Sequence, residues 1–138
     1  MDRCSPLASF LRTTAAVILA GGLLVSCAAS GPDTSPVSAD FLIGTWTVDL
    51  RPMPTADPYY KTFVVTSVDG NSFEGTFYDT PVSEGRINAD WGKLRIAFVT
   101  ADGSGAYHHS AVLEDDRLEG MSNSTGRGFL AYWSAVKQ

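Results

Sequence analysis

Residues 106–136 read AYHHSAVLEDDRLEGMSNSTGRGFLAYWSAV, and this stretch decides the fold. Apolar or small residues alternate with polar ones along three segments, which is the two-residue period of a β-strand with one buried face. Asp115 and Asp116 separate the first two segments, and Asp tolerates the positive φ of a tight hairpin turn. The stretch therefore predicts three consecutive antiparallel strands, over 106–114, 117–124 and 128–136.

The same alternation continues toward the N-terminus between short turn sequences, and it predicts five more strands at 44–50, 60–68, 72–78, 83–89 and 93–100. Short links require neighbouring strands to be antiparallel. The exception is residues 51–58, where three prolines exclude strand pairing and predict a stiff excursion that could cover one mouth of a barrel.

One face of these strands is apolar or small, and the other begins mostly polar. Eight meandering strands with one buried face remove their unpaired edges best by closing on themselves. The sequence therefore predicts an all-β, eight-stranded antiparallel up-and-down barrel, with a two-sheet sandwich as the alternative. The predicted inward residues are Trp46, Val48, Leu50, Phe73, Gly75, Phe77, Gly85, Ile87, Ala89, Leu94, Ile96, Phe98, Tyr107, His109, Ala111, Leu113, Leu118, Gly120, Phe129, Ala131, Trp133 and Ala135.

Arg3 and Arg12, an apolar stretch and the sequence Leu24-Val25-Ser26-Cys27 follow one another in the N-terminal segment, which resembles the signal of a bacterial lipoprotein. Basic residues precede an apolar stretch at 15–25 that is too short to span a bilayer. Residues 24–27 (LVSC) are similar to a lipobox, which implies that Cys27 is lipidated and becomes the first residue of the mature chain. We expect a signal peptide at 1–26, a flexible tether at 27–39 and the barrel domain at 40–138.

Cysteine count and charge limit how the mature domain is stabilised and anchored. The chain has only two cysteines, Cys4 in the removed segment and Cys27 at the acylation site, so no disulfide is expected. Removing residues 1–26 takes away one acidic and two basic residues and changes the formal charge from −5 to −6. This acidic balance argues against nucleic acid as a partner and leaves the acyl chains to hold the protein at a membrane.

Ala28 follows Cys27, and Asp at that position is the signal for retention in the inner membrane. The resemblance therefore implies the outer membrane, facing the periplasm, in a bacterium with two membranes. In a bacterium with one membrane, it implies the outer face of the cell membrane.

Gly44-Thr45-Trp46 at the start of the first predicted strand resembles the Gly-x-Trp signature of lipocalins and avidins, the calycin families. The resemblance implies that Trp46 closes one end of the barrel and that Arg127, before the last strand, covers this tryptophan. Residues 84–88 with Trp91 are similar to an avidin segment, but that segment belongs late in the avidin barrel. Because Val48 stands where avidins place a biotin-contacting Asn, biotin is not expected.

The nearer resemblance is to uncharacterised bacterial lipoproteins with a lipocalin-like barrel, and it implies no particular activity. An eight-stranded barrel is just wide enough to be filled by its own side chains or to hold one small ligand. We expect either a dry core or a mouth pocket for a small apolar ligand, with Tyr107 and His109 as polar orienters. The residues proposed for such a pocket are Trp46, Phe77, Phe98, Tyr107, His109 and Trp133.

A second expectation concerns the outside of the later strands, where apolar residues would face away from the barrel interior. Clustered exposed apolar residues indicate a contact surface. The alternative function is therefore that of a non-catalytic scaffold that associates with itself or with a protein partner. The residues proposed for this surface are Val112, Met121, Leu130 and Tyr132, with Val99 and Val136 nearby.

Catalysis and metal binding find little support in the sequence. His108 and His109 are the only two histidines, and adjacent strand residues point to opposite faces, so they cannot share a metal ion. Ser104 lies in a predicted hairpin turn without the strand-to-helix elbow of a hydrolase. We expect no cofactor, and an enzyme acting on a bound lipid is only a third hypothesis.

The lipid anchor can be tested by mass spectrometry of the mature protein. We expect a chain that begins at Cys27 and carries fatty acid, because residues 24–27 resemble a processing site for acylated cysteine. A mature polypeptide without fatty acid would contradict the membrane assignment.

Overall fold

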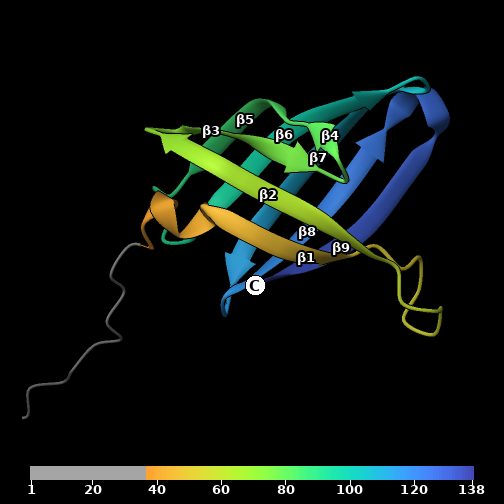
Figure 1. Ribbon diagram of the computed structural model, residues 1–138, viewed down its shortest axis with the longest axis horizontal. Coiled ribbons are helices and arrows are strands. Elements are labelled where there is room, and N and C mark those ends of the chain that lie inside the picture. Colours follow the sequence, from red (N-terminus) through yellow and green to blue (C-terminus); the bar gives the residue numbers. More distant parts are fainter. Residues whose placement is uncertain (1–36) are drawn as a thin grey trace, which may run out of the picture. The chain divides into compact units, whose positions relative to one another are not determined.

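Strands dominate residues 37–138, the part of the chain that the computed structural model describes (Figure 1). The elements are η1 (Ala39–Leu42), β1 (Gly44–Asp49), β2 (Tyr60–Asp69), β3 (Ser72–Phe77), β4 (Thr80–Pro81), β5 (Ser83–Asn88), β6 (Arg95–Asp102), β7 (Gly105–Glu114), β8 (Arg117–Ser124), η2 (Thr125–Arg127) and β9 (Phe129–Lys137). Both helices are short 3₁₀ turns, and within this part of the chain no helix is long and apolar enough to cross a membrane.

The strands form one antiparallel sheet in the order β2-β1-β9-β8-β7-β6-β5-β3-β4, and β2 also pairs with β3. This extra pairing closes the sheet into an eight-stranded barrel, since β4 only extends the β3 hairpin. The predicted barrel is confirmed, and the sandwich alternative is wrong. The architecture is consistent with a calycin-like fold. The predicted signal peptide, Cys27 and most of the tether lie outside the described residues.

The turn after β3 differs from the prediction. Residues 72–78 were expected to form one strand, but β3 ends at Phe77, and Tyr78 and Asp79 have φ of 53° and 61°. The chain therefore reverses sharply, and the two-residue strand β4 pairs back onto β3 with Pro81 opposite Thr76. Pro81 is tolerated there because it lies at a sheet edge, where its missing N–H costs no ladder bond.

The closure between β3 and β5 is the weakest pairing around the barrel. Only one residue pair, Ser72 with Arg86, links the two strands in register. Two further backbone bonds help: Val82 N–H donates to Gly75 at 2.9 Å, and Ile87 N–H donates to Asn71 at 2.8 Å. We refer to this contact between β3 and β5 as the seam.

One end of the barrel is plugged by η1 and the first tryptophan, as the resemblance implies. Trp46 is fully buried, and its indole Nε1 donates to the carbonyl oxygen of Leu42 at 2.9 Å. The cation over this tryptophan is Lys137, whose Nζ lies 5.8 Å from the Trp46 ring. The expectation for Arg127 is wrong, because η2 places Arg127 at the opposite end, against Tyr107.

The interior is packed by aromatic rings from several strands. Phe63 and Val65 of β2 are buried, although the alternation did not assign an inward face to this strand. Phe63 stacks on Phe98 across the barrel, with ring centroids 5.3 Å apart. Trp133 is accommodated by Gly120 on the neighbouring strand, where a Cβ would lie 2.5 Å from the indole. Large and minimal side chains therefore interlock inside the barrel.

Candidate functional site at the open mouth

A cavity of about 560 Å³ opens at the end of the barrel opposite η1. The ends of β1, β3, β6 and β8 and the beginnings of β7 and β9 meet there, together with the β1–β2 loop (Figure 1). The lining residues are Leu50, Pro52, Tyr59, Phe77, Tyr78, Thr80, Thr100, Ala101, Asp102, Tyr107, His109, Ser122, Arg127, Phe129 and Ala131.

Three of the six residues proposed for the pocket line this cavity: Phe77, Tyr107 and His109. The other three do not line it. Trp46 belongs to the plugged end, and the rings of Phe98 and Trp133 lie within the packed core, 5.3 Å and 5.2 Å from the Phe77 ring. Whether a proposed residue lines the cavity or belongs to the packed core depends on its position along its strand, because the cavity occupies only the mouth end of the interior.

The inner end of the cavity is polar, and His109 is its centre. The imidazole Nε2 lies 2.9 Å from Thr100 Oγ1, and Nδ1 lies 2.7 Å from Ser122 Oγ. All three residues are buried and come from the adjacent strands β6, β7 and β8. We call this hydrogen-bonded set Thr100–His109–Ser122 the polar chain.

Aromatic rings hold His109 in place and keep it neutral. Its ring stacks on Phe98 with centroids 4.5 Å apart and contacts Phe77 at 4.6 Å. Burial lowers the pKa of His109 from 6.5 to about 4, with a smaller contribution from the neighbouring His108. At neutral pH the imidazole is therefore uncharged, with one nitrogen as donor and the other as acceptor.

Tyrosines and charged groups surround the mouth. The hydroxyls of Tyr59 and Tyr78 are hydrogen-bonded to each other, which raises the pKa of Tyr59. The ammonium of Lys61 lies 4.6 Å from the Tyr78 ring and 5.1 Å from the Tyr59 ring. These contacts join the end of the β1–β2 loop to the turn after β3. As expected, the loop reaches one mouth of the barrel.

On the other side of the mouth, the Arg127 guanidinium donates to the Tyr107 hydroxyl. The carboxylate of Asp102 accepts a hydrogen bond from the backbone N–H of Ser104 at 2.7 Å, which is the main reason that its pKa is lowered. Both charged groups are at the exposed rim, whereas the inner end of the cavity carries none.

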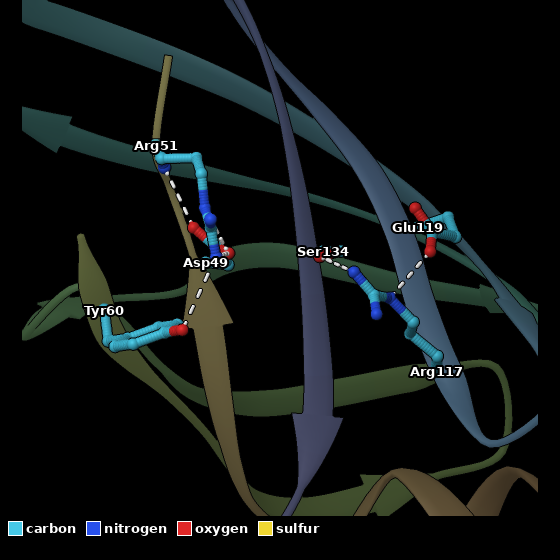
Figure 2. A network of polar contacts seen from close by, with 6 residues as sticks. All are labelled: Asp49, Arg51, Tyr60, Arg117, Glu119 and Ser134. Atoms are coloured by element: carbon cyan, nitrogen blue, oxygen red, sulfur yellow. Dashed lines mark hydrogen bonds and ion pairs between the residues drawn. The ribbon is translucent and has the colours of Figure 1, made fainter. Parts of the chain in front are cut away.

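Outside the barrel, a polar network fixes the start of the β1–β2 loop (Figure 2). Arg51 Nε donates to Asp49 at 2.7 Å, and this hydrogen bond lowers the pKa of Asp49. On the neighbouring strands, Arg117 bonds to Ser134 and forms an ion pair with Glu119 at 2.7 Å. Arg51, at the start of the loop, is therefore held to β1 by Asp49, whereas Arg117 has its own partners on β8 and β9.

The proposed outer contact residues lie on neighbouring strands. Met121 of β8 is directly opposite Tyr132 of β9, and both are about half exposed. Leu130 is 68% exposed, which is unusual for leucine, and Val112 is half-buried. A shallow groove of about 400 Å³ runs past Val112, Met121 and Tyr132. The structure therefore brings these four residues to one outer face.

No protein-family model, curated protein or solved structure matches this chain.

The sequence did not identify Thr100 and Ser122 as site residues. Ser and Thr are common on solvated strand faces, so only strand register reveals that these two lie beside His109 inside the barrel. Their inward direction was available in the sequence, because Thr100 continues the alternation of Ile96 and Phe98, and Ser122 continues that of Leu118 and Gly120.

The lowered pKa of His109 predicts a loss of stability in acid. The pKa of His109 is about 4 in the folded state and 6.5 in its usual environment. The free energy of unfolding should therefore be at its full value above pH 6.5, and it should fall as the pH falls toward 4, because the unfolded state binds the proton more readily. The loss should approach about 3 kcal/mol. Urea unfolding of the wild type and of His109→Gln at pH 7 and pH 4.5 measures it, and the variant should lose less stability than the wild type.

His108→Gln is the matched control, because His108 is exposed on the outer face of the same strand. It should keep most of the wild-type dependence on pH, because burial, and not His108, is the main cause of the lowered pKa of His109. Equal acid destabilisation of the wild type and His109→Gln would show that His109 does not titrate as its burial requires.

Proposed function

We propose that this chain is an exported, lipid-anchored protein whose barrel binds a small, mainly apolar ligand in the open-mouth cavity. The observation that carries the binding proposal is the cavity itself: about 560 Å³, with apolar and aromatic walls and a few polar groups at its inner end. Ligand pockets commonly have volumes of 300–1,000 Å³ and this kind of lining. The lipid anchor is supported by the sequence of residues 24–27.

The division of the barrel into two parts supports binding over simple packing. Trp46 and Leu42 fill the plugged end, so the core there is complete without the mouth. Phe129, by contrast, is 41% exposed although it lines the cavity. An exposed aromatic lining gains by covering its surface with a ligand.

Binding of N-phenyl-1-naphthylamine, an uncharged fluorescent probe, tests this function. The chain has three tryptophans, and Trp91 is 81% exposed whereas Trp46 and Trp133 are buried. In a Trp91→Phe chain, the probe should therefore quench the buried tryptophans saturably. Trp133 should report most strongly, because its ring contacts Phe77 of the cavity wall at 5.2 Å.

The position of the probe is tested by filling the cavity. Ala131→Phe adds a ring to the cavity lining and should weaken binding at least tenfold, whereas Ala97→Phe adds the same ring to the outer face and should not. Equal affinity of these two variants, or the absence of saturable quenching, would refute binding in the cavity.

A second candidate function is self-association through the outer face of β8 and β9. It is favoured by the exposure of Met121, Leu130 and Tyr132 on neighbouring strands. Leu130→Glu should convert a dimer, seen by sedimentation, to a monomer, because it places a charge in the contact. Thr62→Glu, on the exposed outer side of β2, is the control. A monomeric wild type would contradict this alternative.

A further inference from the structure

We propose that the cavity selects an uncharged ligand carrying a hydroxyl or carbonyl group, which hydrogen-bonds to the polar chain Thr100–His109–Ser122 while the apolar part of the ligand fills the mouth. This inference rests on the proposed function and specifies the chemical class of the ligand.

The position of the polar chain is the first support. Thr100, His109 and Ser122 all line the cavity, and their side chains form one continuous set of hydrogen bonds across three strands. The barrel interior around them is otherwise aromatic, with Phe77 and Phe98 against the imidazole. A ligand that enters the cavity fully therefore meets a single polar region at its inner end.

Hydrogen-bond counting gives the second support. A neutral imidazole donates through one nitrogen and accepts through the other. If Nε2 accepts from Thr100, then Nδ1 donates to Ser122, and the Ser122 hydroxyl proton remains available. In the other tautomer, Ser122 donates to Nδ1 and the Thr100 hydroxyl proton remains available. Either way, the polar chain keeps one hydroxyl donor and spare acceptor lone pairs.

A free hydroxyl donor with nearby acceptors matches a ligand carbonyl, which accepts, or a ligand hydroxyl, which does both. An apolar group placed there would leave the hydroxyl without a partner, at a cost in affinity. A site that hydrogen-bonds one group of a ligand usually rejects an analogue without that group more strongly than an apolar pocket rejects a ligand of slightly different size.

The third support is the distribution of charge. His109 is neutral at pH 7 because burial lowers its pKa to about 4. Among the lining residues, the charged side chains are Asp102 and Arg127, both at the exposed rim, and Arg127 is already bonded to Tyr107. A carboxylate at the inner end would lose its hydration without gaining a cation, which is unfavourable. The cavity should therefore reject an anionic head group.

Three probes of nearly equal size separate these possibilities: 4-phenylphenol, biphenyl and biphenyl-4-carboxylate. Binding of each to the full chain can be measured by calorimetry at pH 7. We expect 4-phenylphenol to bind about tenfold more tightly than biphenyl, the usual value of one added hydrogen bond. The carboxylate should bind more weakly than 4-phenylphenol.

Variants of the polar chain locate the selectivity. Ser122→Ala and Thr100→Val each remove one hydroxyl, and at least one of them should lower the affinity for 4-phenylphenol about tenfold while leaving biphenyl unchanged. Ser110→Ala removes a hydroxyl from the outer face of β7 and should change neither affinity. The measurements on the unmodified chain remain decisive if a variant does not fold.

The outcomes distinguish this inference from the proposed function. If biphenyl binds as tightly as 4-phenylphenol, or the carboxylate binds most tightly, the inference is wrong and the binding function stands. If both variants retain full affinity for 4-phenylphenol, the polar chain is not the recognition site. If none of the three probes binds and N-phenyl-1-naphthylamine does not bind either, the proposed function fails as well.

Discussion

Closure of the sheet is the constraint on which the rest of this structure depends. The pairing of β2 with β3 gives every long strand two neighbours and creates an interior of fixed width. That width forces inward residues to alternate between rings and minimal side chains, as with Trp133 over Gly120. The described domain achieves this without a disulfide, so burial and strand pairing provide its stability.

The two ends of the barrel differ in how far the interior is closed to solvent. At one end, η1 folds across the opening, and Trp46 and Leu42 fill it. At the other, tyrosines and the polar chain leave space. A neutral His109 between aromatic rings is stable there because Thr100 and Ser122 satisfy both of its nitrogens. The packed core therefore reaches one end of the barrel, and the cavity lies at the other.

Alternation predicted the barrel and most inward residues, because a two-residue period reports directly which face of a strand is buried. It gave no face for β2, where Phe63, Val64 and Val65 form an unbroken apolar run. It also failed to separate cavity lining from core: Phe77 and Phe98 have the same pattern, and only their depth along the barrel divides them. The partners of His109 likewise depend on register, which no local pattern contains.

The seam between β3 and β5 is the place where strand edges are least well paired, whereas the other neighbouring strands of the barrel are paired over longer stretches. Few backbone bonds hold it, so its strands should separate before others do and expose edges that could pair with another chain. The local sequence opposes such growth. Pro81 lacks an N–H, Glu84 adopts a φ of 53° that breaks the register of β5, and Arg86 places a charge on this edge. Each of these three features disfavours the pairing of this edge with a strand of another chain.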